Sequence, residues 1–218
     1  RANRDGVDWS ELAHQQIDLF RGDMVDLRVI PPAHYIGAVE AIPLVFDAIT
    51  DLQEQSSIYP VDTDYYFSVK SDSKFGFRSN LSQKQMLDIF SQRGGDPDRV
   101  GKQDPLDCLV WMSQRVSEPG WDSNLGKGRP GWHIECTAIA LEYLEPSDLD
   151  ETLIDIQGGG SDLIFPHHEM CATQAQVITG KELASTYVHA GMIGLDGEKM
   201  SKSKGNLVFV SRLVASGV

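Results

Sequence analysis

The 218-residue chain has few cysteines and no long apolar run. No apolar stretch approaches the roughly 18–20 residues that a membrane span needs, so we expect a soluble protein without a membrane partner. Its three cysteines, Cys108, Cys136 and Cys171, are too few and too odd in number for a disulfide framework. A reducing compartment fits this usage better, and we therefore expect a cytoplasmic protein.

Basic residues are also scarce, with 19 Lys and Arg against 32 Asp and Glu, giving a formal charge of −13. Affinity for polyanions comes mainly from Lys and Arg, so this segment alone is not expected to hold a nucleic acid. A local phosphate site remains compatible with this balance. The apolar fraction of 41% and charged fraction of 23% are those of an ordinary globular protein.

Apolar spacing in the first half predicts a helix over residues 9–27 and a second over 34–55, which Pro43 could kink. Aromatic and β-branched residues at 65–69 favour a strand. Residues 71–130 alternate short glycine-containing pieces with brief apolar stretches, which indicates an inserted, loop-rich lobe.

The second half predicts a helix over 132–144 and a short buried strand at 153–156. This strand leads into Gly158, Gly159 and Gly160, and another helix is expected near Pro166. Further strands are expected at 187–190 and 192–195. A strand, a glycine turn and a helix in this order are typical of a nucleotide-binding α/β fold.

The triple glycine lets the main chain approach a ligand and turn sharply. Ser161 and Asp162 would then lie at the mouth of the site, where a carboxylate could accept hydrogen bonds from ribose hydroxyls. A plain turn that serves packing explains the glycines about equally well.

A zinc site is suggested by thiol and imidazole side chains, which are Cys136, His167, His168 and Cys171. Zinc favours such ligands, and residues three or four apart on a helix share one face. Spacing alone nevertheless favours buried, apolar cysteines together with core or capping histidines.

Residues 199–206, KMSKSKGN, gather three lysines, two serines and a glycine. Such a loop can place ammonium groups on a polyphosphate. Composition alone favours a solvated basic loop.

Specific motifs change this balance, because KMSKS at 199–203 is a signature of class I aminoacyl-tRNA synthetases. The segments GRPGWHIEC at 128–136, GGGSDL at 158–163 and FPHHE at 165–169 resemble the cysteine-activating branch of that class, and RAN at 1–3 also fits. The resemblance implies an α/β fold of the Rossmann nucleotide-binding type with an inserted lobe.

The resemblance divides the chain into three parts. Residues 1–70 would belong to the first half of the catalytic domain, 71–128 to the inserted lobe, and 129–218 to the second half. The HIGH signature of the class is missing, and both ends look internal to a longer protein, so we expect a fragment that lacks an N-terminal part and a C-terminal helical domain. Such a fragment should catalyse little by itself.

Two members of this branch are close alternatives: cysteinyl-tRNA synthetases and the cysteine ligases of mycothiol biosynthesis. Gln157 stands where the synthetases typically have histidine, and the segments at 135–141 and 190–197 also look more like the ligases. We therefore favour a ligase that joins cysteine to the amine of glucosaminyl-inositol. A tRNA-charging enzyme is the alternative, and a catalytically silent zinc-binding or regulatory protein is a third interpretation.

The resemblance also implies a cysteine pocket. Cys136 and His167 match zinc ligands, a further cysteine ligand is expected upstream of residue 1, and Trp132 matches an aromatic wall. Synthetases often have glutamate where Cys171 stands, so Cys171 is either an extra ligand or a bystander, and we favour the bystander. Zinc prefers thiolate to hydroxyl, which would reject serine without editing.

For ATP, the resemblance implies that Lys199 and Lys202 steady the triphosphate in the transition state. The full set of matching ATP-binding positions is Gly158, Gly159, Gly160, Ser161, Asp162, Lys199, Met200, Ser201, Lys202 and Ser203. Cysteine and ATP, with Mg²⁺ on the phosphates, would give cysteinyl-adenylate and pyrophosphate. The acceptor amine would then form an amide and release AMP.

Overall fold

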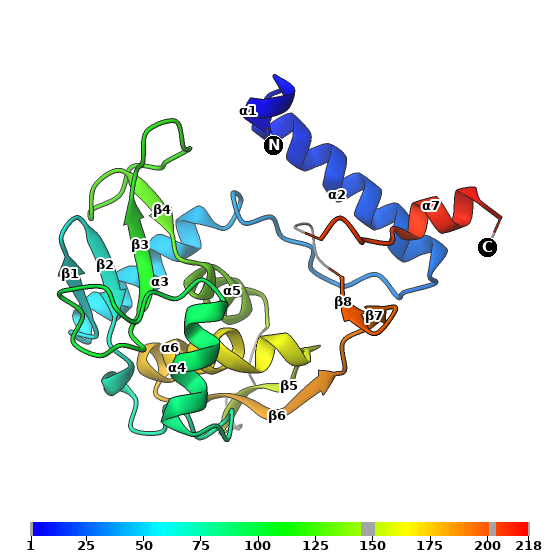
Figure 1. Ribbon diagram of the computed structural model, residues 1–218. Helices are drawn as coiled ribbons and strands as arrows, with labels where there is room; N and C mark the ends of the chain where they lie inside the picture. The colour runs from blue at the N-terminus through cyan, green and yellow to red at the C-terminus, as the bar shows by residue number, and fades with distance from the viewer. Residues whose placement is uncertain (1, 145–150, 201–203, 218) are drawn as a thin grey trace. The chain divides into compact units, whose positions relative to one another are not determined.

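The computed structural model describes residues 2–144, 151–200 and 204–217 of the chain (Figure 1). The chain divides into two compact units, one formed by residues 1–35 and 193–218 and the other by 36–192. Among the described helices, none combines the length and apolar character required to cross a bilayer.

The smaller unit contains short elements around one long helix. Helix α2 (Trp9–Asp26) confirms the helix expected over 9–27, and Asp8 caps it by accepting hydrogen bonds from the amides of Ser10 and Glu11 at 2.9 and 3.1 Å. Helix α7 (Val210–Ala215) packs on α2. The remaining elements of this unit are α1 (Ala2–Asp5) and the antiparallel pair β7 (Gly194–Leu195) and β8 (Glu198–Lys199).

The larger unit begins with helix α3 (Ile42–Glu54), and the expected start at residue 34 is wrong. Pro43 lies in the first turn of α3, where its missing N–H costs no intrahelical hydrogen bond, and it therefore starts the helix without kinking it. The residues just before α3 form turns.

An antiparallel sheet in the order β1-β2-β3-β4 follows α3. Its strands are β1 (Ile58–Val61), β2 (Asp64–Phe67), β3 (Cys108–Ser113) and β4 (Gly128–Pro130). The strand expected at 65–69 is confirmed as β2, but Val69–Ser71 forms a short 3₁₀ turn. The sheet combines strands from both sides of the boundary expected at 70/71, and that boundary stays a prediction.

The segment expected to be a loop-rich lobe also contains helix α4 (Gln83–Gln92). Ser82 and Gln85 form a reciprocal capping box at its start: the Ser82 amide donates to Gln85 Oε1 at 3.0 Å, and the Gln85 amide donates to Ser82 Oγ at 3.4 Å.

A parallel strand pair joined by a helical crossover forms the last part of the unit. Strand β5 (Thr152–Gly160) pairs with β6 (Glu182–Ala190), and the chain between them contains the turns Ser161–Leu163 and Ile164–His168 and helix α6 (Glu169–Thr179). Helix α5 (Trp132–Tyr143), which precedes β5, confirms the helix expected over 132–144. The described chain thus has the mixed α/β character of the expected fold class.

Strand β5 differs from the expectation in two respects. It is longer than 153–156 and is not buried throughout, because Ile156 is 61% exposed. It also includes Gly158, Gly159 and Gly160, which pair with β6. The chain turns only after Gly160, whose φ of −73° and ψ of 155° are extended. The glycines therefore end a strand and do not themselves make the turn.

The main core lies where the antiparallel sheet meets α3, α5 and α6. Its largest fully buried side chains include Trp111, Phe67, Phe165, Ile49, Leu52, Ile134 and Met170. A second cluster joins α6 to the parallel strands through Leu153, Cys171, Ala172, Ala175 and Leu183. Both clusters contact α6, so the residues at its start are held from two sides.

Candidate functional site

An aromatic and sulfur cluster lies where the start of α5 meets the start of α6. The Trp132 ring stacks on His167, with centroids 4.4 Å apart and an interplanar angle of 23°. His133 Nδ1 lies 3.0 Å from His167 Nδ1. On the other side of the His167 ring, Nε2 lies 3.9 Å from Cys171 Sγ. His133, His167 and Cys171 are buried, whereas Trp132 is exposed.

Gly131 fixes the start of α5, and with it the positions of Trp132 and His133. A Cβ at this position would lie 1.9 Å from the main-chain oxygen of Leu109, and the Gly131 amide donates to the oxygen of Val110 at 2.7 Å. Only glycine allows such a close approach between the start of α5 and strand β3. The RPGWH sequence therefore places the tryptophan and histidine at a fixed point beside the sheet.

The histidines of the cluster are electrically neutral near pH 7. Burial disfavours the charged ring and lowers the pKa of His133 to about 3, with a smaller contribution from His167. Burial likewise lowers the pKa of His167 to about 4. A neutral imidazole can ligate a metal, and when one ring nitrogen does so the other usually donates a hydrogen bond. His133 Nδ1 is in position to accept that bond.

The thiols of Cys171, in the cluster, and of Cys136, one turn after Trp132, are protonated. Burial raises the pKa of Cys171, and although Cys136 is exposed as a residue, desolvation of its thiol beside Glu135 raises its pKa to about 11. The Cys171 Sγ–H donates to the main-chain oxygen of His133 at 3.4 Å. Binding of a metal cation would favour the thiolates that coordinate it.

The residues present fit zinc chemistry in part. A tetrahedral zinc ion with ordinary bond lengths separates a sulfur and a nitrogen ligand by about 3.6 Å, close to the 3.9 Å between Cys171 Sγ and His167 Nε2. Within the described ranges, no three His, Cys, Asp or Glu side chains form a group able to hold a metal. A complete site would thus need a further donor or movement of Cys136. The predicted ligands Cys136 and His167, and the role of Cys171, stay predictions.

The end of β5 lies against a second histidine pair. His168 Nδ1 is 2.8 Å from His189 Nε2 on β6. A Cβ on Gly159 would lie 2.9 Å from both His168 Cε1 and Leu163 Cδ1, and one on Gly160 would lie 2.6 Å from Asp162 Oδ1. All of these atoms are at the ends of side chains, which can move aside, so packing alone does not require glycine at either position. The ATP-binding role of these glycines stays a prediction.

The structure gathers the predicted cysteine-site residues within the larger unit. Trp132, His167 and Cys171 belong to the cluster, Cys136 follows one turn later on α5, and His168 links the cluster to the glycine end of β5. Ser161 and Asp162 form the turn after that strand. In the smaller unit, Lys199 ends β8 and Met200 follows it. The predicted residues Ser201, Lys202 and Ser203 lie outside the described residues.

Three side chains of this region were not singled out in the sequence. His133 could have been found, because it lies three positions before Cys136 and so shares its side of a helix. His189 had no spacing that connects it to His168, since the strands pair across a crossover. Arg93 donates to the main-chain oxygens of Asp162 and Phe165, contacts that span 69 and 72 residues and leave no local signal.

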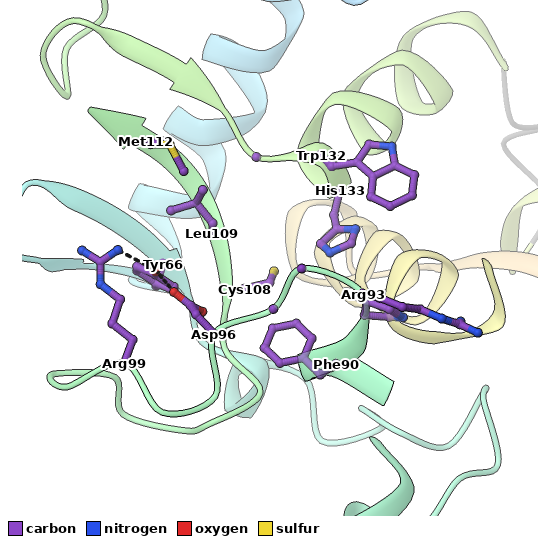
Figure 2. A pocket seen from close by; sticks show the side chains of 14 residues that line it. Tyr66, Phe90, Arg93, Asp96, Arg99, Cys108, Leu109, Met112, Trp132 and His133 are labelled. Carbon is purple, nitrogen blue, oxygen red and sulfur yellow. Dashed lines mark hydrogen bonds between the residues drawn. The ribbon is translucent and has the colours of Figure 1, made fainter. Parts of the chain in front are cut away.

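A pocket of about 190 Å³ adjoins Trp132 and His133 (Figure 2). Its walls come from β2, β3, α4 and the loop after it, the start of α5, and Pro166. In Figure 2, Tyr66, Asp96 and Arg99 lie on one side of the pocket, with Trp132 and His133 on the other.

The family model and the curated relatives that match this chain agree with one another. The family model for class I (C) tRNA synthetase catalytic domains matches residues 1–216. A protein of Kribbella flavida named L-cysteine:1D-myo-inositol 2-amino-2-deoxy-alpha-D-glucopyranoside ligase is 60% identical over 97% of this chain and 51% of its own length. Proteins with the same name from Thermomonospora curvata and Streptomyces coelicolor are 56% and 57% identical over the whole chain, and the matches cover 51% and 52% of their lengths.

The chain therefore spans about half the length of the curated relatives it matches. These matches confirm the resemblance that the KMSKS, WHIEC, GGGSDL and FPHHE motifs indicated. The chain belongs to the family of class I (C) tRNA synthetase catalytic domains.

Proposed function

We propose that the protein carrying this chain is an ATP-dependent cysteine ligase of mycothiol biosynthesis. It would activate L-cysteine as cysteinyl-adenylate and transfer the cysteinyl group to the amine of glucosaminyl-inositol. The observation that carries this proposal is the identity of 56–60% to proteins named as that ligase, over nearly the whole chain. Gln157, in place of a synthetase histidine, supports the same choice.

The cluster at α5 and α6 would bind the cysteine substrate. Cys136 and His167, with Cys171 as a further candidate, would hold zinc, which when bound supplies a Lewis acid that selects a thiolate over a hydroxyl. Trp132 is exposed and stacked on His167, so its ring is available as one wall of the pocket. His133 would fix the orientation of the His167 ring through the 3.0 Å contact between their Nδ1 atoms.

The family resemblance assigns ATP binding to residues at the glycine end of β5 and to residues of the KMSKS segment. Asp162 follows Gly160 directly, and its carboxylate is in the turn where a ribose hydroxyl could be bound. Lys199 and Lys202 would stabilise the negative charge that builds on the phosphates during attack by the cysteine carboxylate, with Mg²⁺ on the same phosphates.

The two buried histidines of the cluster are poor general bases for the second step. His133 and His167 have pKa values of about 3 and 4, so they bind a proton weakly near neutral pH. A neutral amine is already a competent nucleophile. The role of the protein would then be to hold the amine against the acyl carbon and to exclude water.

The decisive experiment follows labelled cysteine in the protein expressed from its complete gene. ATP and zinc are supplied, with glucosaminyl-inositol in one reaction and cysteine tRNA in another. We expect the label in a small amide, together with AMP. Label on tRNA would replace the proposal with the synthetase alternative, and label in neither product would favour a catalytically silent protein. Omitting ATP is the control for exchange without activation.

A further inference from the structure

The pocket beside Trp132 and His133 is separate from the zinc-ligand candidates and from the glycine end of β5. It is lined by 66, 90, 93–96, 99, 108, 109, 112, 131–133 and 166, which include none of Cys136, His167 and Cys171. It shares Trp132 with the cysteine site, so a molecule in the pocket would lie next to a cysteinyl group held there. The acceptor of the second step has to bind next to the cysteinyl group, because its amine attacks the acyl carbon.

The far end of the pocket is built from polar groups that are already held in place. The Asp96 carboxylate accepts from the Tyr66 hydroxyl through Oδ2 and from Lys102 Nζ at 3.0 Å through Oδ1. Arg99 donates to the same hydroxyl at 3.0 Å and to Asp64 at 2.7 Å. In Figure 2 the dashed lines join Arg99, Tyr66 and Asp96 into one network.

Asp96 has capacity left for a ligand. An ionised carboxylate offers about four lone-pair sites, and Tyr66 and Lys102 occupy two of them. Its side chain is 41% exposed. A carboxylate fixed in this way can accept from neighbouring hydroxyls of a polyol, because its partners have already removed its rotational freedom.

The size of the pocket limits what it can take. Its volume of about 190 Å³ is below the roughly 300–1,000 Å³ of sites that enclose drug-sized ligands. One six-membered polyol ring is of suitable size for such a pocket. The hydrophobic walls from Phe90, Leu109 and Met112 would face the C–H edges of such a ring.

We propose that this pocket is the acceptor subsite, that it holds the inositol ring of glucosaminyl-inositol near Asp96, and that the glucosamine amine points towards Trp132. This assignment rests on the proposed ligase function and adds to it the residues that recognise the acceptor. The ring order follows from the chemistry, because the amine has to reach the acyl group and the other ring must therefore lie farther from it.

The test fills the pocket from strand β3 by Met112→Trp. Val116→Trp introduces the same ring at a position that is 96% exposed and does not line the pocket. Glucosaminyl-inositol binding is measured by calorimetry on the protein expressed from its complete gene, and acceptor, ATP and cysteine KM values are measured alongside. Circular dichroism checks that each variant is folded.

We expect Met112→Trp to raise the dissociation constant and KM of the acceptor at least tenfold more than the KM of ATP or cysteine. Val116→Trp should change the acceptor values less than threefold. Equal acceptor binding by wild type and Met112→Trp would overturn the pocket assignment and leave the ligase function standing, as would a larger effect on ATP than on the acceptor. If the wild type binds no glucosaminyl-inositol and charges tRNA, both the pocket assignment and the ligase function fail.

Discussion

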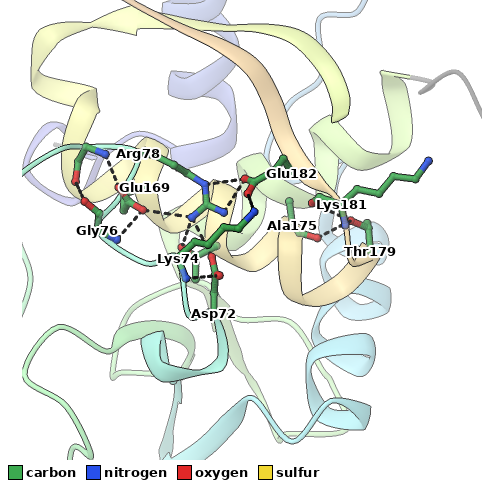
Figure 3. Close-up of polar contacts among 11 residues, drawn as sticks. Asp72, Lys74, Gly76, Arg78, Glu169, Ala175, Thr179, Lys181 and Glu182 are labelled. Atoms are coloured by element: carbon green, nitrogen blue, oxygen red, sulfur yellow. Dashed lines mark hydrogen bonds and ion pairs between the residues drawn. The ribbon is translucent and has the colours of Figure 1, made fainter. Parts of the chain in front are cut away.

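Glu169 provides the sharpest test of how the start of α6 is held (Figure 3). It follows His167 and His168 directly, and its carboxylate is completely buried. It accepts from the amides of Gly76 and Ser79 at 2.9 and 2.6 Å, and its Oε1 lies 3.4 Å from Arg78 Nη1. One side chain thus joins the 72–79 loop to the helix that carries Cys171.

The perturbation is Glu169→Gln, which keeps the size and removes the charge. The glutamine NH₂ would face a main-chain N–H, and Arg78 would lose one of its buried carboxylate partners. Breaking a buried charge pair costs about 3–5 kcal/mol. We therefore expect the free energy of unfolding to fall by about 3 kcal/mol. In a chain of this length that corresponds to about 6–12 °C in Tm.

Glu182→Gln is the matched control. Glu182 also binds Arg78, at 2.8 Å, and it binds Lys74 at 2.7 Å, but its side chain is 29% exposed. Because Glu182 is partly exposed, solvent screens part of its charge, and we expect Glu182→Gln to cost less than Glu169→Gln. Urea unfolding followed by tryptophan fluorescence measures both variants. A cost below about 1 kcal/mol for Glu169→Gln, or equal costs for the two, would refute the reasoning.

Three further predictions concern stability. Burial alone would raise the pKa of Asp64, but two arginines and a main-chain amide lower it. Asp64 therefore stabilises the fold above its unfolded pKa of about 3.9, and this contribution is lost as the pH falls through its folded pKa. In urea unfolding from pH 6 to 2, Asp64→Asn should lose less unfolding free energy than the wild type, and an equal loss in both would contradict this. Ser82→Ala removes half of a capping box and should cost about 1 kcal/mol in urea unfolding. Gly131→Ala places a Cβ 1.9 Å from the Leu109 oxygen and should cost at least about 2 kcal/mol of unfolding free energy. Gly22 lies in a helix with open space around it, so Gly22→Ala should stabilise the fold by roughly 0.5–1 kcal/mol. Similar unfolding midpoints for the two variants would show that the contact at Gly131 does not determine stability.

The sequence was most informative where the signal is local. The helices over 9–27 and 132–144 follow from apolar spacing, and the structure places them within a residue of those limits. Short motifs such as KMSKS at 199–203 and FPHHE at 165–169 indicated the family, which the comparison with known proteins confirms. Both kinds of information are contained in a few consecutive residues.

The structure decided features that depend on distant parts of the chain. Pro43 was expected to kink a helix that begins at residue 34, but the helix begins at Ile42 and packs against the core from there, with Pro43 in its first turn. The triple glycine suggested a turn, but pairing with β6 and the approach of His168 made it the end of a strand.

In the candidate site, too, some features follow from local sequence and others only from contacts between distant segments. Residue types and family motifs could nominate Cys136, His167 and Cys171, because thiol and imidazole side chains are the ligands that zinc favours. The 3.0 Å contact between His133 and His167, and the pocket between Asp96 and Trp132, join segments more than thirty residues apart. Such contacts arise only when the core brings α5, α6 and the antiparallel sheet together, since no local pattern encodes which distant side chains will meet.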